Sequence, residues 1–222
     1  MRSSASVPGE LPASTFHSMT DLGVDFVLFD LGGVIVELGD VSSLQEIADS
    51  VGDEEHWRER LSSPCVRRFE KGECSATEFS TQAVSEWDLD VPPERFLEIF
   101  RDWVIGPYAG AEELLWEARQ SVQIGCLSNT NAMHWEHQVS RWSVLSTFDF
   151  RFLSFELGLA KPDRAIFEAV ADQLPFRRDR ILYLDDVAEN SLAARSFGFR
   201  SEHVRGIDEV KTVLRGIGVL SG

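Results

Sequence analysis

Residues 24–30, with the sequence VDFVLFD, decide the fold of this chain. The run is short, nearly continuous in apolar residues, rich in β-branched and aromatic side chains, and ends in the carboxylate of Asp30. Such a run is typical of a strand buried on both faces of a parallel sheet. Two glycines, Gly32 and Gly33, follow almost at once. The sequence therefore predicts a central strand that delivers Asp30 to the edge of a sheet.

From about residue 108 onward, short apolar runs alternate with amphipathic segments. We expect strands at 122–127, 150–154 and 181–184, and helices at 112–119, 162–173, 190–197 and 208–216. Alternating strand–helix units imply an α/β protein with a doubly wound parallel sheet. In such a sheet the carboxyl ends of the strands meet at one edge, where reactive groups gather.

The block of residues 39–107, between the first strand and the alternating part, differs in character. Apolar residues recur there at a spacing of three to four, which predicts helices at 42–51, 54–61, 76–87 and 93–104. Ser75 stands three residues before Glu78, a capping-box pattern that opens a helix. We expect no good strand in this block and interpret it as an inserted α-helical cap.

These patterns divide the chain into three parts. Residues 1–22 are rich in Ser and Pro and lack the apolar stretch of a secretory signal, so we expect a flexible leader. Residues 23–38 and 108–222 would form the α/β core, and residues 39–107 the cap. A chain of 222 residues is long enough for one domain with such an insertion.

Composition narrows the class of protein. The chain has 21 Lys and Arg against 37 Asp and Glu, a net charge of −16, which disfavours nucleic-acid binding and docking on anionic membranes. No apolar run approaches the ~20 residues that span a bilayer. Cys65, Cys74 and Cys126 lack metal-ligand spacing, which is typical of a reduced, cytoplasmic protein without a zinc site. The sequence leaves open whether the protein is a monomer or a homodimer.

Polar residues stand where the predicted strands end. One follows the first strand, two follow the strand at 122–127, two follow the strand at 181–184, and a lysine precedes the helix at 162–173. The set is Asp30, Ser128, Asn129, Lys161, Asp185 and Asp186. Taken singly, each could be a cap, a turn residue or a solvated charge. Together at one sheet edge they predict a chemical site.

These motifs resemble those of the haloacid dehalogenase-like (HAD) superfamily over residues 24–216. The matching segments are FDLGGV at 29–34, LSNT at 127–130, KP at 161–162 and LDD at 184–186. The insert resembles the C1-type cap, and the most similar branch contains small sugar-phosphate phosphatases and the phosphatase domain of soluble epoxide hydrolase. The resemblance implies a HAD-like Rossmannoid core and Mg²⁺-dependent hydrolysis of a small phosphorylated metabolite of the sugar-phosphate type.

The resemblance also implies roles in phosphoryl transfer. Asp30 would attack phosphorus and form an aspartyl-phosphate intermediate. Ser128 and the backbone of Asn129 would hold phosphoryl oxygens, and Lys161 would balance the charge of the nucleophile and the phosphate. Asn190, four residues after the acidic pair, would steady its loop.

A magnesium site is implied by the same resemblance. Asp186, Asp30 and a backbone carbonyl near Gly32 would hold Mg²⁺, because hard oxygen ligands and substrate phosphate are what this ion prefers. Asp185 would be a more distant or alternate ligand. Metal-independent haloacid dehalogenation also fits the fold, but it has little use for the acidic pair at 185–186.

One position departs from the pattern of the family. Its phosphatases usually carry a second Asp two residues after the nucleophile, as general acid and base, where this chain has Gly32. Such proton transfer is typically worth ~10²–10⁴ in rate. Three outcomes stay open: a slow phosphatase, one restricted to good leaving groups, or a catalytically inactive relative that binds a phosphorylated metabolite or partner.

Weaker features have two readings each. The most basic stretch of the insert, residues 67–73, could reach over a substrate or be a solvated helix face. His134 could contact substrate, but a packing or surface role is more common. Trp57, Trp87 and Trp103 are expected to pack in the cap.

Overall fold

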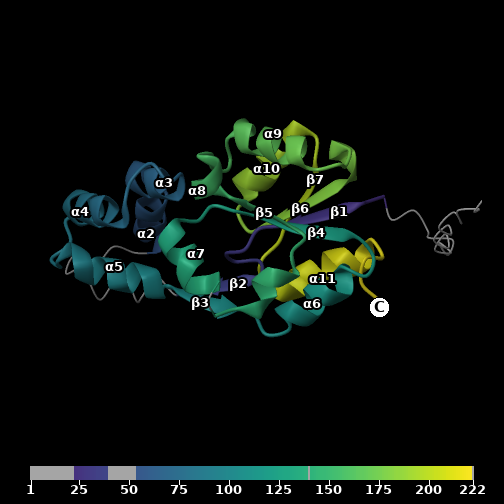
Figure 1. Cartoon of the computed structure of the whole chain (residues 1–222), viewed down its shortest axis with the longest axis horizontal. Coiled ribbons are helices and arrows are strands. Elements are labelled where there is room, and N and C mark those ends of the chain that lie inside the picture. The colour runs from purple at the N-terminus through teal and green to yellow at the C-terminus, as the bar shows by residue number, and fades with distance from the viewer. Residues whose placement is uncertain (1–22, 40–53, 140, 222) are drawn as a thin grey trace, which may run out of the picture.

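The computed structural model describes residues 23–39, 54–139 and 141–221, and a five-stranded sheet lies at its centre (Figure 1). The strand order is β5-β4-β1-β6-β7, with every neighbouring pair parallel. The strands are β1 (Phe26–Phe29), β4 (Gln123–Ser128), β5 (Phe150–Leu153), β6 (Ile181–Asp185) and β7 (Arg200–His203). The predicted parallel sheet is confirmed, whereas the predicted leader at 1–22 and helix at 42–51 lie outside the described residues.

Strand β1 is apolar throughout because helices cover both faces of the sheet. Val27 and Phe29 belong to the cluster shared with α6 (Ala111–Ala118) and α11 (Gly206–Gly216). Phe26 and Leu28 belong to the opposite cluster, shared with α9 (Arg164–Gln173) and α10 (Ala188–Phe197). Figure 1 shows these two helix pairs below and above the sheet. Successive side chains of a strand point to opposite faces, so a doubly covered strand has no polar side.

The helices between β2 and β3 form a lobe at the side of the sheet (Figure 1). Those that the structure describes are α2 (Glu54–Leu61), α3 (Pro64–Glu70), α4 (Ala76–Glu86) and α5 (Pro93–Asp102). They share a separate apolar cluster that contains Trp57, Trp87 and Phe79. The capping box of Ser75 and Glu78 opens α4 as predicted. The helical character of this block is thus confirmed over its described part.

The prediction of a block without strands is wrong at its end. The helix predicted over 93–104 stops at Asp102, and β3 (Val104–Pro107) pairs antiparallel with β2 (Val36–Leu38). The β-branched residues Val104 and Ile105 favour extended backbone. Gly39 N donates to Trp103 O at 2.6 Å and prolongs the contact between the two connections. A two-stranded ribbon therefore joins the helical lobe to the sheet.

Several other short elements of the described residues also had no counterpart in the sequence-based prediction, and four of them belong to the helical lobe or the sheet and its surroundings. These four are α3, α7 (Ala132–Val139), α8 (Ser154–Leu157) and β7. In the described part of the chain, no helix has both the length and the apolar character needed to cross a bilayer.

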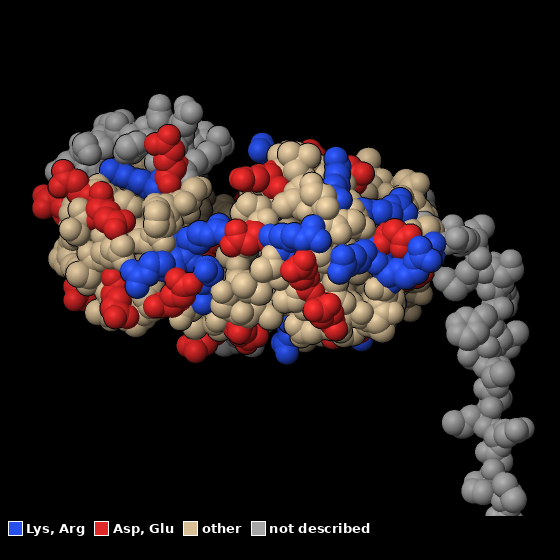
Figure 2. Space-filling view, turned by 90° about the horizontal axis from the view of Figure 1, so that it is seen from above, with Lys and Arg blue, Asp and Glu red and all other residues tan. Residues whose placement is uncertain are grey.

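Acidic and basic side chains are mixed over the face shown in Figure 2, where a shadowed notch separates the helical lobe from the rest.

Candidate active site

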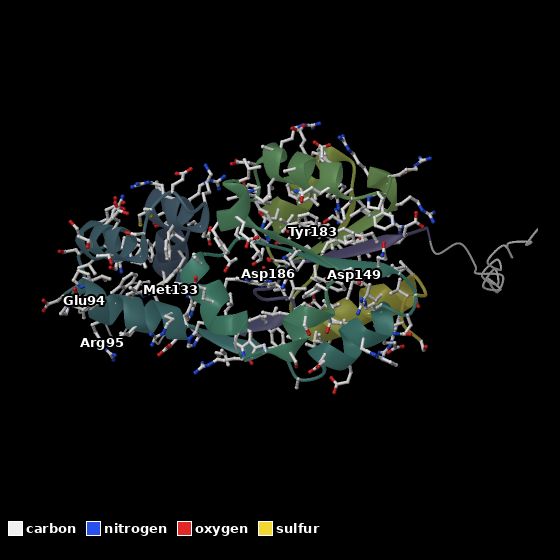
Figure 3. All side chains as sticks on the ribbon, viewed as in Figure 1. Glu94, Arg95, Met133, Asp149, Tyr183 and Asp186 are labelled. Atoms are coloured by element: carbon white, nitrogen blue, oxygen red, sulfur yellow. The ribbon has the colours of Figure 1, made fainter. Side chains whose placement is uncertain are left out.

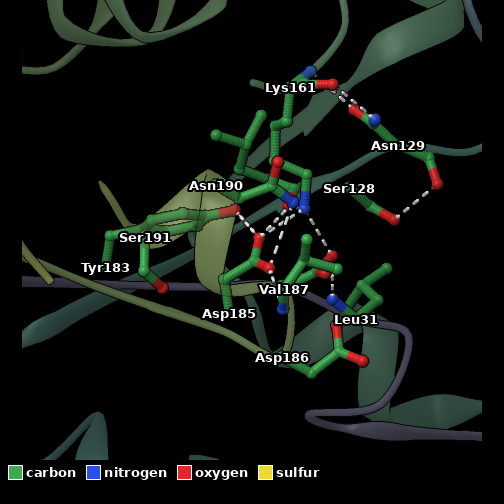
Figure 4. Close-up of polar contacts among 12 residues, drawn as sticks. Leu31, Ser128, Asn129, Lys161, Tyr183, Asp185, Asp186, Val187, Asn190 and Ser191 are labelled. Atoms are coloured by element: carbon green, nitrogen blue, oxygen red, sulfur yellow. Dashed lines mark hydrogen bonds and ion pairs between the residues drawn. The ribbon is translucent and has the colours of Figure 1, made fainter. Parts of the chain in front are cut away.

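The carboxyl ends of β4, β1 and β6 bring the predicted polar residues together. Asp30 directly follows β1, its backbone N–H donates to Leu184 O at 2.8 Å, and its Oδ1 accepts from Leu31 N at 2.7 Å. Ser128 ends β4 and Asp185 ends β6, the two strands that flank β1. The close-up in Figure 4 shows this cluster, with Lys161 reaching into it.

Lys161 is a buried cation that bridges two of these strand ends. Its Nζ lies 2.9 Å from Asp30 Oδ1 and 2.8 Å from Asp185 Oδ2, and donates to Leu127 O at 3.3 Å. Only 1 % of its side chain is exposed. Burial by itself would lower the pKa of Lys161, but Asp185 and Asp30 raise it above the usual value. Lys161 therefore stays charged, unlike a solvated surface lysine.

Asp185 is held on both of its oxygens. Val187 N donates to Oδ1 at 2.7 Å, Asn190 Nδ2 donates to both oxygens at 3.1 Å, and the Tyr183 hydroxyl donates to Oδ2. Burial would raise the pKa of Asp185, but Lys161, the Tyr183 hydroxyl and the Val187 N–H hold it below its usual value. The sequence prediction missed Tyr183, which sits two residues before Asp185 on β6. A carboxylate satisfied in this way is fixed in place and holds Lys161.

Asn129 uses its side chain to hold the backbone of Lys161. Asn129 Oδ1 accepts from Lys161 N at 2.9 Å, and its Nδ2 donates to Lys161 O at 3.1 Å. Ser128 is buried and lines the same cavity as Asp30. The loop after β4 thus fixes where Lys161 enters the site.

Three carboxylates form a cluster with the spacing of a cation site. One oxygen from each of Asp30, Asp185 and Asp186 lies within 4.8 Å of the others. Burial raises the pKa of Asp30 well above its usual range, Lys161 opposes the rise, and the other two carboxylates add to it. Burial and then Asp185 also raise the pKa of Asp186. The positive charge of Lys161 does not balance the three carboxylates of this cluster. A hard divalent cation would balance the negative charge that is left.

Gly33 is required by the position of Asp186. Its φ of 68° lies in the left-handed region, and a Cβ added there would lie 2.6 Å from Asp186 Cγ. Gly32 differs, because a Cβ at that position would meet only the side chain of Leu38, at 3.3 Å. The backbone therefore needs glycine at 33 and not at 32.

A cavity of about 280 Å³ opens above the carboxylates. Its polar floor comes from the sheet edge, and its opposite wall comes mainly from apolar residues of the ribbon and the helical lobe. That wall includes Leu38, Leu61, Val66, Phe100, Trp103 and Val104. Figure 3 shows Asp186 at the end of the sheet nearest the lobe, with Asp149 toward the other end. A molecule bound in this cavity would contact both parts.

His134 packs in the wall of this cavity. Its Nε2 lies 2.8 Å from Phe100 O, its Nδ1 lies 3.1 Å from Asn131 Nδ2, and its ring stacks on Phe100 at 4.9 Å. Burial lowers the pKa of His134 to about 4.

Trp103, predicted as a packing residue, also lines the cavity and donates from Nε1 to Gly39 O at 2.6 Å.

Comparison with known proteins identifies a family and several relatives. The family described as haloacid dehalogenase-like hydrolase matches residues 27–204. A sesquiterpene phosphatase of Aspergillus oryzae is 26% identical over 80% of this chain and 88% of its own. A D-ribitol-5-phosphate phosphatase of Bacteroides thetaiotaomicron is 25% identical over 79% of this chain and 89% of its own. A pyrimidine 5'-nucleotidase of Escherichia coli is 25% identical, but the match spans only 61% of that protein and 60% of this chain.

Solved structures share the fold. A HAD family enzyme of Bacteroides thetaiotaomicron, solved in complex with magnesium and inorganic phosphate, superposes with a TM-score of 0.66. It is 23% identical and covers 81% of this chain and 93% of its own. The magnesium complex of an enzyme with the same description has a TM-score of 0.72, at 22% identity over 87% of this chain and 99% of its own.

Proposed function

The chain belongs to the haloacid dehalogenase-like hydrolase family, and on this premise we propose that it is a Mg²⁺-dependent phosphatase of small phosphomonoesters. The observation that carries the proposal is the buried Lys161, which joins Asp30 to Asp185; Asp186 completes the carboxylate cluster, and Asp30 and Asp186 line the cavity. A cation that faces a nucleophile and an acidic cluster suits the negative charge of a transferring phosphoryl group. The phosphatase names of two relatives support the proposal.

In the proposed reaction Asp30 is the nucleophile. Its carboxylate attacks phosphorus, the bond from phosphorus to the leaving oxygen breaks, and an aspartyl phosphate forms on Asp30. Water then attacks phosphorus, which releases inorganic phosphate and restores the carboxylate. Ser128 and the backbone of Asn129 would hold phosphoryl oxygens, while Lys161 neutralises charge and keeps Asp30 aligned.

We assign the metal to Asp30, Asp186 and the backbone carbonyl of Gly32. Mg²⁺ at this place supplies positive charge to the phosphoryl oxygens when it is bound. The oxygens of Asp185 already accept hydrogen bonds, so Asp185 would not bind the metal directly. It would position Lys161 and add negative charge to the site. Carboxylate and carbonyl oxygens fit a hard cation.

We further propose that residues 39–107 act as the cap that selects substrate, over a core of residues 23–38 and 108–222. The apolar wall and the sesquiterpene phosphatase relative favour the phosphate ester of a weakly polar alcohol. The ribitol phosphate phosphatase relative favours a sugar-phosphate-type substrate, as the sequence predicted. An assay should therefore include phosphate esters of weakly polar alcohols and sugar phosphates.

The proposed function is tested with a panel of phosphomonoesters assayed with Mg²⁺ and with chelator. The panel holds sugar phosphates, a prenyl phosphate, an aryl phosphate and, as a contrasting chemistry, a 2-haloacid. We expect phosphate release that chelator abolishes and Mg²⁺ restores. No turnover across the panel, with Mg²⁺ still bound by calorimetry, would favour a non-catalytic binder. Metal-independent halide release would favour a dehalogenase.

Gly33→Ala should weaken magnesium binding by about tenfold or more, in line with the usual cost of disturbing the surroundings of a ligand. The added methyl overlaps Asp186 and forces either the loop or the carboxylate to move. Gly158→Ala is the matched control, because Gly158 has a similar φ of 66° but no atom within 4 Å of an added Cβ, and it should bind Mg²⁺ within about threefold of wild type. Isothermal titration of each protein measures both affinities, and equal affinities would refute the assignment of Asp186.

A further inference from the structure

The proposed reaction needs a proton donor and acceptor that Gly32 cannot provide. The leaving oxygen must receive a proton, and the attacking water must lose one. Three carboxylates are among the described residues that line the cavity: Asp30, Asp186 and Glu70. The first is the proposed nucleophile and the second a proposed metal ligand. Glu70, the last residue of α3 in the helical lobe, has no role in the mechanism so far.

The backbone of Glu70 is linked to the loop that follows β4. Ser154 Oγ lies 2.6 Å from Glu70 O, and the same hydroxyl accepts from Thr130 N at 2.8 Å. Ser154 is fully buried. One hydroxyl thus connects the end of α3 with the loop after β4. This junction places Glu70 at the boundary between lobe and sheet.

Arg67, one helical turn before Glu70, attaches α3 to the segment that carries Lys161. Its Nη2 lies 2.6 Å from Asp163 Oδ2, and its Nη1 donates to Lys161 O at 3.3 Å. Gly72, in the turn after α3, packs so closely that a Cβ would lie 2.7 Å from Phe155 O. Contacts on both sides of Glu70 therefore hold it over the site.

The Glu70 carboxylate is free to exchange a proton. Within the described part of the chain, no hydrogen bond or ion pair engages its carboxylate oxygens. Burial raises the pKa of Glu70 to about 7, although Lys161 and then Arg67 oppose the rise. Glu70 also lines a second cavity, together with Arg67 and Lys161. The other charged groups that line the two cavities are Asp30, Asp163, Asp186 and Glu189. A carboxyl group that is partly protonated near neutral pH suits both halves of acid–base catalysis.

We propose that Glu70 is the general acid and base of this site, supplied by the inserted helices in place of the side chain that Gly32 lacks. The inference rests on the proposed phosphatase function. In the first step the Glu70 carboxylic acid gives its proton to the leaving oxygen as Asp30 binds phosphorus, so the product is the neutral alcohol. In the second step the Glu70 carboxylate takes a proton from water as that water attacks phosphorus. Phosphate and the Asp30 carboxylate are released, and Glu70 is protonated again.

The test is Glu70→Gln, which keeps the shape of the side chain but cannot exchange the proton. With an aryl phosphate, whose leaving group needs no acid, the variant should release one equivalent of alcohol per enzyme in a burst. Steady turnover should then fall by ~10²–10⁴. With an alkyl phosphate, the burst should be lost as well. Glu73→Gln is the matched control, since Glu73 lies outside both cavities and pairs with Lys71 at 2.8 Å.

A rescue variant separates catalysis from structure. Gly32→Asp in the Glu70→Gln background should recover at least about tenfold of the lost steady turnover, because it restores a carboxyl group beside Asp30. If the wild-type protein is active and Glu70→Gln turns over substrate at the same rate, the role of Glu70 is overturned, while the proposed phosphatase function stands. Equal losses of burst and steady turnover with every leaving group, without rescue, would assign Glu70 a structural role. No turnover by wild type would overturn the proposed function and this inference with it.

Discussion

Asp30→Asn should abolish turnover of every phosphomonoester, with kcat lower by on the order of 10⁴–10⁶. The amide has nearly the shape of the carboxylate but cannot form the bond to phosphorus. The stability of the protein should not fall, since burial, with Asp185 and Asp186, raises the pKa of Asp30 in spite of the attraction to Lys161, so a neutral side chain is favoured there. Steady-state kinetics with saturating Mg²⁺ and thermal unfolding measure the two effects.

Asp25→Asn is the control for this variant. Asp25 lies just before the amino end of β1, and its partly exposed side chain pairs with Arg180 at 2.7 Å. Loss of such a pair costs at most about 1 kcal/mol and should leave turnover unchanged. Residual activity of Asp30→Asn within about tenfold of wild type would contradict the nucleophile assignment.

Lys161→Met should be the most destabilising change at the site, lowering the free energy of unfolding by about 3–5 kcal/mol and abolishing turnover. Asp185 is fully buried and Asp30 nearly so, and Lys161 is the cation that contacts both. Without it, the two carboxylates lose their partner in a medium that solvates charge poorly. Urea unfolding with and without Mg²⁺ measures the loss.

Two further variants are needed to interpret the unfolding of Lys161→Met: the control Lys211→Met and a double variant of Lys161 and Asp185. Lys211 is partly exposed and lies 3.8 Å from Asp208, so its loss should cost less than about 1 kcal/mol. Adding Asp185→Asn to Lys161→Met should restore part of the stability, because it neutralises one stranded carboxylate. A single variant Lys161→Met that loses less than about 1 kcal/mol would show that the bridge contributes little.

The three central strands of the sheet, β4, β1 and β6, were predictable because nearly all of their residues are buried on both faces. Runs such as VDFVLFD need no distant partner to be recognised, and the polar residues after them fall at one edge by topology alone. The edge strand β7 was missed because Ser201 is its one buried residue, while Arg200, Glu202 and His203 are exposed. The ribbon strand β3 was missed because it depends on pairing with β2, which lies far away in sequence. The apolar spacing of α5 also continues to Val104.

The identity of the site residues was predictable, but their contacts were not. The sequence could not show that the Asn129 side chain holds Lys161, or that Asp185 is enclosed by Tyr183 and Asn190. Glu70 lay within a charged stretch with the composition of a solvated helix face. Its place in the cavity depends on the docking of α3, which follows from Ser154 and Arg67 contacts between segments distant in sequence.

The stereochemical course at phosphorus tests the central claim most directly. A chiral phosphorothioate ester is hydrolysed in isotopically labelled water, and the configuration of the product is determined. Two successive displacements, first by Asp30 and then by water, predict net retention of configuration. Net inversion would mean that water attacks the substrate itself, and it would contradict an intermediate on Asp30.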